Sequence, residues 1–213
     1  MRNLILSARR REKIVGLSLA LSLFAASAAA LAVNPQDNVR GFYDTLLTTM
    51  RYGPTLGQSG RYARLAPVVD RLFDVPAMAR MAVGPTWATL SPAQQQQLID
   101  AFRHYIAATY ADRFDSYSGQ QLQVTGERPY NGDVIVQTKI VKSDGDITDL
   151  DYLMRQNQGS WQISDVYLDG TISQVAIQRS EFHSILRREG VDGLVAVLNR
   201  KVDLLGKGVA KAS

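Results

Sequence analysis

The fold is decided by residues 122–167, which read LQVTGERPYNGDVIVQTKIVKSDGDITDLDYLMRQNQGSWQISDVY. Through most of this stretch apolar and polar residues alternate, a period of two that is typical of strands with one buried face. The dipeptides Asn131-Gly132 and Asp144-Gly145 are typical of tight hairpin turns. The pattern therefore predicts an antiparallel sheet of about four strands joined by short turns.

Residues with helical spacing flank this sheet on both sides. The longest predicted helix begins at the capping box Ser91-Pro92-Ala93-Gln94 and carries a broad aromatic stripe that includes Phe102, Tyr105 and Tyr110. The Gly- and Pro-containing segment 52–60 is expected to be a loop. The other expected helices are shorter and cover residues 35–50, 62–73, 76–84, 172–189 and 192–205.

The order of helices, then strands, then helices indicates an α+β fold in which about six or seven helices wrap a curved antiparallel sheet. We expect one domain over residues 33–205, with a helical part at about 33–118, the sheet at about 120–168 and closing helices at about 172–205. Residues 206–213 are expected to be a flexible tail.

The first 32 residues have the pattern of an export signal. Residues 1–13 carry five basic side chains against one acidic one, and residues 14–31 carry no charge. Ala30-Leu31-Ala32 fits the small residues that precede a cleavage site. The alternative is an uncleaved membrane anchor, since the apolar stretch is nearly long enough to span a bilayer. We expect cleavage near Ala32 and a periplasmic protein.

Removal of this segment changes the charge of the chain. The 24 Lys+Arg and 20 Asp+Glu of the full sequence become 19 of each. A neutral mature protein gives no support to a nucleic-acid partner. The chain also contains no cysteine, so disulfides, a Cys nucleophile and Cys-ligated metals are excluded.

The sequence contains little that points to catalysis. There is no phosphate-binding glycine loop, nucleophile elbow or zinc-protease motif, and neither His104 nor His183 has a second ligand at metal spacing. We therefore expect no enzyme activity, no metal and no cofactor. The alternative from a different class is a small enzyme that uses His104 or Asp165 as acid or base.

Five short pieces together resemble the MlaC family, also described as toluene-tolerance auxiliary components of ABC transporters, and its hopanoid-associated HpnM branch. The pieces are Leu90–Gln94, Ala101–Tyr105, Tyr117–Gly119, Trp161–Val166 with Gly170 and Ser173, and Ile185-Leu186 through Gly190 to Asp192–Leu194. The resemblance implies an NTF2-like sheet with an apolar pocket between sheet and helices. It also implies a carrier that holds the acyl tails of a phospholipid and shuttles it between an outer-membrane lipoprotein complex and an inner-membrane ABC transporter complex with its substrate-binding ring.

The residues expected to line such a pocket are the inward-facing strand positions and part of the aromatic helix stripe: Phe102, Tyr105, Ile106, Val134, Val136, Ile140, Leu150, Tyr152, Met154 and Ile163. Arg103 and Asp165 are expected to have a structural role or to lie as polar groups near the pocket. The HpnM branch implies a hopanoid or another polycyclic lipid as the alternative ligand.

Overall fold

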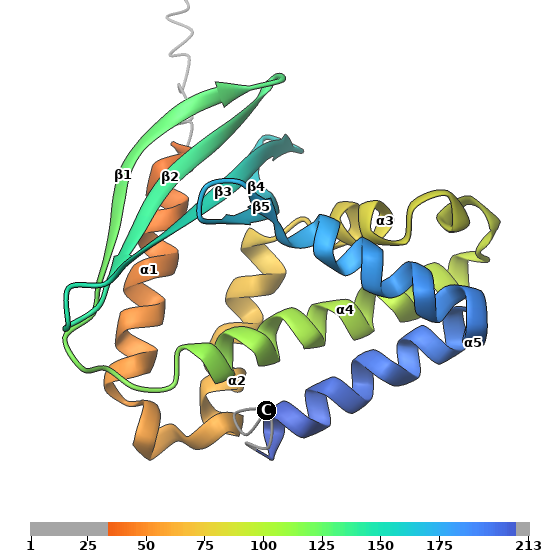
Figure 1. The fold of residues 1–213 in the computed structure, drawn as a ribbon, viewed down its shortest axis with the longest axis horizontal. Helices are drawn as coiled ribbons and strands as arrows, with labels where there is room; N and C mark the ends of the chain where they lie inside the picture. Colours follow the sequence, from red (N-terminus) through yellow and green to blue (C-terminus); the bar gives the residue numbers. More distant parts are fainter. Residues whose placement is uncertain (1–33, 208–213) are drawn as a thin grey trace, which may run out of the picture. The chain divides into compact units, whose positions relative to one another are not determined.

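The computed structural model describes residues 34–207, which form five α-helices, one 3-10 helix and a sheet of five strands. The helices before the sheet are α1 (Pro35–Arg51), α2 (Gly53–Leu72), α3 (Val75–Val83), η1 (Gly84–Thr89) and α4 (Pro92–Arg113), and α5 (Gln174–Gly206) follows it. This order is the predicted helix, sheet, helix order of an α+β fold (Figure 1). The predicted signal segment and the tail from residue 208 lie outside the described residues.

The sheet has five antiparallel strands in the order of the chain. They are β1 (Gln121–Tyr130), β2 (Asp133–Val141), β3 (Ile147–Asn157), β4 (Ser160–Leu168) and the two-residue β5 (Ile172–Ser173). The predicted turn at Asn131-Gly132 joins β1 to β2, and both residues have the positive φ that this kind of hairpin turn requires. β5 corrects the prediction that a helix begins at Ile172, because these two residues pair with β4 before the helix starts.

The long helix α4 begins as its capping box predicts. The hydroxyl of Ser91 accepts a hydrogen bond from the backbone N–H of Gln94, and the Gln94 side chain accepts one from the backbone N–H of Ser91. Pro92 occupies the first turn, where a proline costs no hydrogen bond. The sequence therefore sets the start of this helix locally, before any packing.

The expected loop at residues 52–60 is wrong, because α2 already begins at Gly53. Pro54 occupies the first turn of this helix, and the helical backbone is interrupted at Gly57, which has a φ of 60°. Gly53 lies against the backbone of Asp115, so that a Cβ atom there would come within 1.8 Å of the Asp115 carbonyl oxygen. The glycine permits a close approach between two chain segments, and it is not a sign of a loop.

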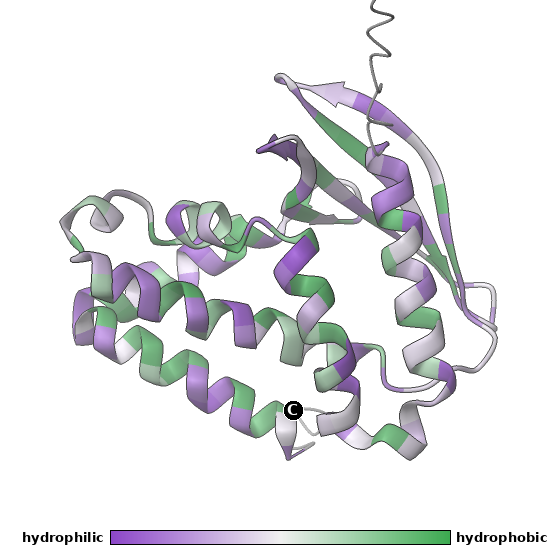
Figure 2. Cartoon of the chain, turned by 180° about the vertical axis from the view of Figure 1, so that it is seen from behind, coloured by the Kyte–Doolittle hydropathy of each residue, from purple (hydrophilic) through white to green (hydrophobic). Residues whose placement is uncertain are grey.

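The two predicted closing helices are the two halves of α5. Gly190 interrupts it with a φ of 68° and a non-helical ψ, at the residue where the sequence predicts the end of one helix and the start of the next. α4 and α5 run side by side, and α1 lies along the sheet (Figure 1). Figure 2 shows hydrophobic and hydrophilic residues alternating along these helices, as expected for helices with one face in the core.

Within residues 34–207, no helix combines the length and the apolar character needed to cross a bilayer. The buried side chains of all five α-helices and of the sheet form one continuous core. Where α1 meets the sheet, the ring of Phe42 makes edge-to-face contacts with the rings of Phe73 and Tyr152. The ring of Tyr43 makes another with Tyr152.

Candidate functional site

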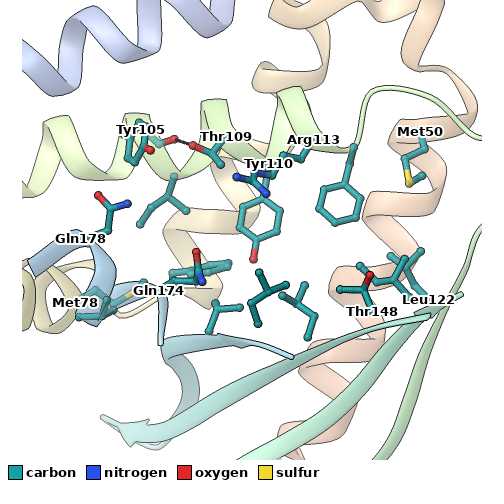
Figure 3. Close-up of a pocket in the computed structure, with 18 of the residues that line it drawn as sticks. Met50, Met78, Tyr105, Thr109, Tyr110, Arg113, Leu122, Thr148, Gln174 and Gln178 are labelled. Atoms are coloured by element: carbon teal, nitrogen blue, oxygen red, sulfur yellow. Dashed lines mark hydrogen bonds between the residues drawn. The ribbon is translucent and has the colours of Figure 1, made fainter. Parts of the chain in front are cut away.

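A cavity of about 510 Å³ lies between α4, the inner face of the sheet and the start of α5 (Figure 3). Its wall is mostly apolar and consists of Met50, Phe73, Met78, Phe102, Tyr105, Ile106, Thr109, Tyr110, Arg113, Phe114, Gln120, Leu122, Ile140, Lys142, Thr148, Leu150, Val166, Leu168, Gln174, Val175 and Gln178. The volume is in the range of small-molecule sites. This cavity is the candidate site for an apolar ligand.

One side of the cavity is a stripe along α4. Its members follow at spacings of three and four residues, which places them on one face of a helix, and they are Phe102, Tyr105, Ile106, Thr109, Tyr110 and Arg113. Figure 3 shows Tyr105, Thr109 and Arg113 in succession along this helix. The stripe spans twelve residues, and the eleven steps between its ends cover about 16 Å at the rise of an α-helix.

The opposite side is built from inward-facing positions near one end of the strands. Leu122, Ile140 and Thr148 lie side by side across β1, β2 and β3. Leu150 lies opposite Leu168 on β4. Since these residues belong to one face of the sheet, the alternation of the sequence is what directs them into the cavity.

Five of the ten expected lining residues lie in the cavity wall, namely Phe102, Tyr105, Ile106, Ile140 and Leu150. The other five lie outside this wall, namely Val134, Val136, Tyr152, Met154 and Ile163. They face the same side of the sheet but lie further along the strands, where four of them are buried in the core and Val134 packs against it partly exposed.

The division has a physical cause in α1. The rings of Phe42 and Tyr43 pack against Tyr152, with centroids 6.3 and 5.9 Å apart. The Tyr43 hydroxyl also shares a hydrogen bond with the Thr138 hydroxyl, which donates to the Leu150 carbonyl oxygen. These side chains fill the space above that half of the sheet, so only the half beyond them is left open.

Several residues of the cavity wall lie on helices that no sequence pattern places at the cavity. Met50 and Met78 come from α1 and α3, and Val175 and Gln178 come from the start of α5. Nothing in their local sequence says that these helices converge on one space. Thr109 and Tyr110 could have been predicted as lining residues, because they continue the α4 stripe at helical spacing.

Three tyrosines meet where the cavity borders the core: Tyr43 and Tyr152 are buried, and Tyr110 lines the cavity and is partly buried. Burial raises the pKa of Tyr43 to about 12, partly offset by its hydrogen bond with Thr138. Burial likewise raises the pKa of Tyr110 and that of Tyr152 well above the usual value near 10. The Tyr152 hydroxyl lies near the other two but makes no well-formed hydrogen bond. All three phenols are therefore neutral at physiological pH.

Asp165 has a structural environment outside the cavity wall. One carboxylate oxygen accepts hydrogen bonds from the backbone N–H groups of Val166 and Val175, at 2.7 and 3.1 Å, and the other accepts one from the Ser173 hydroxyl at 2.5 Å. This carboxylate connects β4 to the first turn of α5. Its side chain is buried with its acceptors used.

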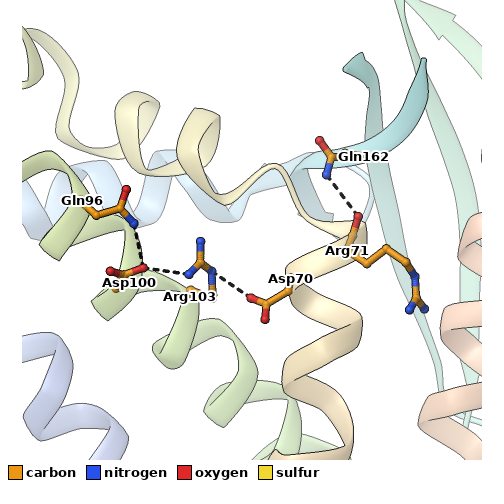
Figure 4. Close-up of polar contacts among 6 residues, drawn as sticks. All are labelled: Asp70, Arg71, Gln96, Asp100, Arg103 and Gln162. Carbon is orange, nitrogen blue, oxygen red and sulfur yellow. Dashed lines mark hydrogen bonds and ion pairs between the residues drawn. The ribbon is translucent and has the colours of Figure 1, made fainter. Parts of the chain in front are cut away.

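Arg103 also lies outside the cavity wall, on the face of α4 turned toward α2 (Figure 4). Its guanidinium pairs with Asp70 of α2 at 2.9 Å and with Asp100 of α4 at 2.8 Å. Gln96 donates a further hydrogen bond to Asp100 at 3.0 Å. Arg103 joins two helices through their polar faces.

The proposed acid/base residues do not come together. His104 is exposed, with its ring 6.5 Å from the ring of Tyr62 on α2, whereas Asp165 is bonded to the start of α5. His183 is exposed on α5, on a shallow surface with Arg179 and Arg187. Across residues 34–207, no three His, Asp or Glu side chains are grouped in a way that could hold a metal ion.

Comparison with known proteins agrees with this architecture. A family model described as MlaC protein matches residues 41–200. A solved structure of a phospholipid-binding protein from Ralstonia solanacearum, in complex with a phospholipid, is similar to this chain with a TM-score of 0.68 and 25% sequence identity. The match covers 81% of this chain and 98% of that one. The chain belongs to the MlaC family.

Proposed function

We propose that this protein is a periplasmic carrier that holds the acyl chains of a phospholipid in the cavity between α4 and the sheet. The observation that carries the proposal is the cavity itself, about 510 Å³ in volume and walled mostly by apolar side chains. The similar protein from Ralstonia solanacearum is described as binding a phospholipid, and its match extends over nearly its whole length.

The physical task of such a carrier is to shield acyl chains from water. Each methylene group exposed to water costs about 0.8 kcal/mol, so a phospholipid leaves a bilayer spontaneously only very slowly. An apolar cavity in a protein that moves through water removes most of that cost. The task requires an apolar wall and an opening for the headgroup, and it uses no catalytic residue.

The route of the lipid is the finer part of the proposal. We propose that the carrier moves lipid between an outer-membrane lipoprotein complex and an inner-membrane ABC transporter complex with its substrate-binding ring. The export signal expected over residues 1–32 supports a location outside the inner membrane. Cell fractionation followed by N-terminal sequencing should find a mature periplasmic chain that starts near Val33. We also propose that residues 33–205 of this chain fold as one domain.

A vesicle transfer assay tests the carrier function. Donor vesicles contain phosphatidylethanolamine with a fluorescent label on one acyl chain, and acceptor vesicles contain none. The mature protein should raise the rate of transfer in proportion to its concentration. A rate equal to that without protein would contradict the proposal.

A matched pair of variants assigns the transfer to the cavity. Leu150→Trp places a large ring in the cavity wall, whereas Ile147→Trp changes an exposed side chain of the same strand. We expect Leu150→Trp to lower the transfer rate at least about tenfold, since a filled cavity cannot accept an acyl chain, and Ile147→Trp to keep the wild-type rate. Equal rates for both variants would place the lipid elsewhere.

A further inference from the structure

The charged residues of the cavity wall are all basic. Only Arg113 and Lys142 carry a charge among the residues that line it, and no carboxylate is present. An acidic side chain near a lipid phosphate would repel it, whereas Arg and Lys form short charge-assisted hydrogen bonds with phosphate oxygens. The composition of the wall is therefore suited to an anionic group attached to an apolar body.

The two cations come from different elements but lie toward the same end of the cavity. Arg113 is the last residue of α4, and Lys142 follows Val141, the last residue of β2. Lys142 is two residues beyond Ile140, which pairs with Leu122 and Thr148 at that end. In Figure 3, Arg113 lies beyond Thr109 on the side of Met50 and Leu122, opposite the end with Met78 and Gln178.

A basic residue at the end of α4 has an ordinary explanation, because a cation in the last turn interacts favourably with the helix dipole. That explanation does not extend to Lys142, which belongs to the β2–β3 hairpin. The ion pair of Lys142 with Asp146 is 3.3 Å long and both partners are exposed. Such a pair contributes little to stability, so Lys142 can exchange it for a phosphate.

The dimensions of the cavity agree with this orientation. From Phe102 to Arg113 the α4 stripe extends about 16 Å, and an extended chain covers about 1.2 Å per bond, which corresponds to about 13 bonds. This length is sufficient for acyl chains that lie along α4 and extend away from the cations.

We propose that Arg113 and Lys142 bind the phosphate of the lipid headgroup, so that the protein selects phosphate-bearing lipids over neutral lipids with the same acyl chains. This inference rests on the proposed carrier function and assigns the polar end of its site. It also separates the two ligand classes that the sequence leaves open, because a neutral polycyclic lipid has no phosphate to offer these two residues.

A competition between two lipids tests the proposal. The delipidated mature protein is incubated with vesicles that contain equal amounts of phosphatidylglycerol and diacylglycerol with identical chains, and native mass spectrometry measures the ratio bound. We expect the wild-type protein to favour phosphatidylglycerol by at least about tenfold, the size of a charge-assisted contact. The double variant R113Q/K142Q should bind as much lipid in total, at a ratio near one.

The matched control is K139Q/R188Q, which removes one Lys and one Arg outside the cavity wall. It should keep the wild-type ratio. The proposal is overturned if R113Q/K142Q also keeps that ratio, or if it loses both lipids equally while remaining folded by circular dichroism. If the wild-type protein binds neither lipid, the carrier function itself fails, which is a different result from a wild-type protein that binds both lipids without preference.

Inorganic phosphate separates a headgroup site from a general anion site. Added to the same mixture at the concentration of the lipid, it should leave the wild-type ratio unchanged, because the acyl chain contributes most of the binding free energy of the lipid. A ratio that falls to that of R113Q/K142Q would show that free phosphate occupies the two cations, and would overturn their assignment to the lipid headgroup.

Discussion

The ring of Tyr43 on α1 lies with its centroid 5.9 Å from that of Tyr152 on β3, at an interplanar angle of 71°. This contact marks where the filled core ends. On one side of it Val136 and Met154 have no exposed surface, and on the other side Ile140 and Leu150 line the cavity. The same face of the same strands therefore serves stability at one end and ligand binding at the other.

Because the filled core ends at this contact, two truncations on the same sheet face should lower the free energy of unfolding by different amounts. Met154→Ala opens a new hole in a filled region and should lower the free energy of unfolding by about 2–5 kcal/mol. Ile140→Ala enlarges a cavity that already exists and should cost about 2 kcal/mol less than Met154→Ala. Urea unfolding followed by circular dichroism measures both, and equal losses would show that the two positions are packed alike.

The buried phenol of Tyr43 predicts a loss of stability in alkali. Its pKa is about 12 in the folded protein and near 10 when exposed. Only the unfolded chain loses this proton between those values, so the contribution is complete below pH 10 and declines as the pH rises toward 12. The shift corresponds to about 3 kcal/mol. Tyr43→Phe should lose less stability across that window, and the exposed Tyr117→Phe should follow the wild-type curve. Urea unfolding at each pH checks this, and parallel curves for all three proteins would contradict it.

The hydrogen bonds of Asp165 predict a structural phenotype for its removal. Asp165→Ala leaves the buried N–H groups of Val166 and Val175 without their acceptor, which should cost about 3 kcal/mol. Asp165→Asn keeps one carbonyl oxygen as acceptor and should cost less. Thermal unfolding measures the losses, with the exposed Asp149→Ala as the control expected to remain near wild type. A stable Asp165→Ala protein that no longer binds lipid would instead make Asp165 a ligand contact.

The ion pairs of Arg103 predict only a small effect. Its side chain and that of Asp70 are 32% and 54% exposed, so solvent screens their attraction. Arg103→Ala should therefore lower the free energy of unfolding by about 1 kcal/mol or less and leave phospholipid transfer unchanged. A transfer rate that drops in a folded Arg103→Ala protein would mean that the polar face of α4 takes part in lipid exchange.

The features of this fold that depend on neighbouring residues could be predicted from the sequence. The Ser91 and Gln94 capping box, the Asn131-Gly132 turn and the break at Gly190 depend on a few neighbouring residues, and each lies where its pattern predicts. The sheet face could also be predicted, since alternation assigns Val136 and Ile140 to one side. The reading of residues 52–60 failed because Gly53 is required by contact with a distant segment, around Asp115.

The position of the cavity could not be predicted in the same way. A period of two says which side of a strand is covered, but it does not say how far along the strand the covering helix reaches. That limit is set by Phe42 and Tyr43 of α1 against Tyr152, contacts between residues about one hundred positions apart. Five of the ten expected lining residues consequently lie outside the cavity wall.

Native mass spectrometry of the mature protein purified from a periplasmic extract, with identification of whatever is released, tests the central claim most directly. The account predicts a phosphate-bearing acyl lipid at about one per chain in the wild-type protein, and a much lower occupancy in Leu150→Trp. A folded wild-type protein that carries no lipid, and takes none up from vesicles, would contradict it.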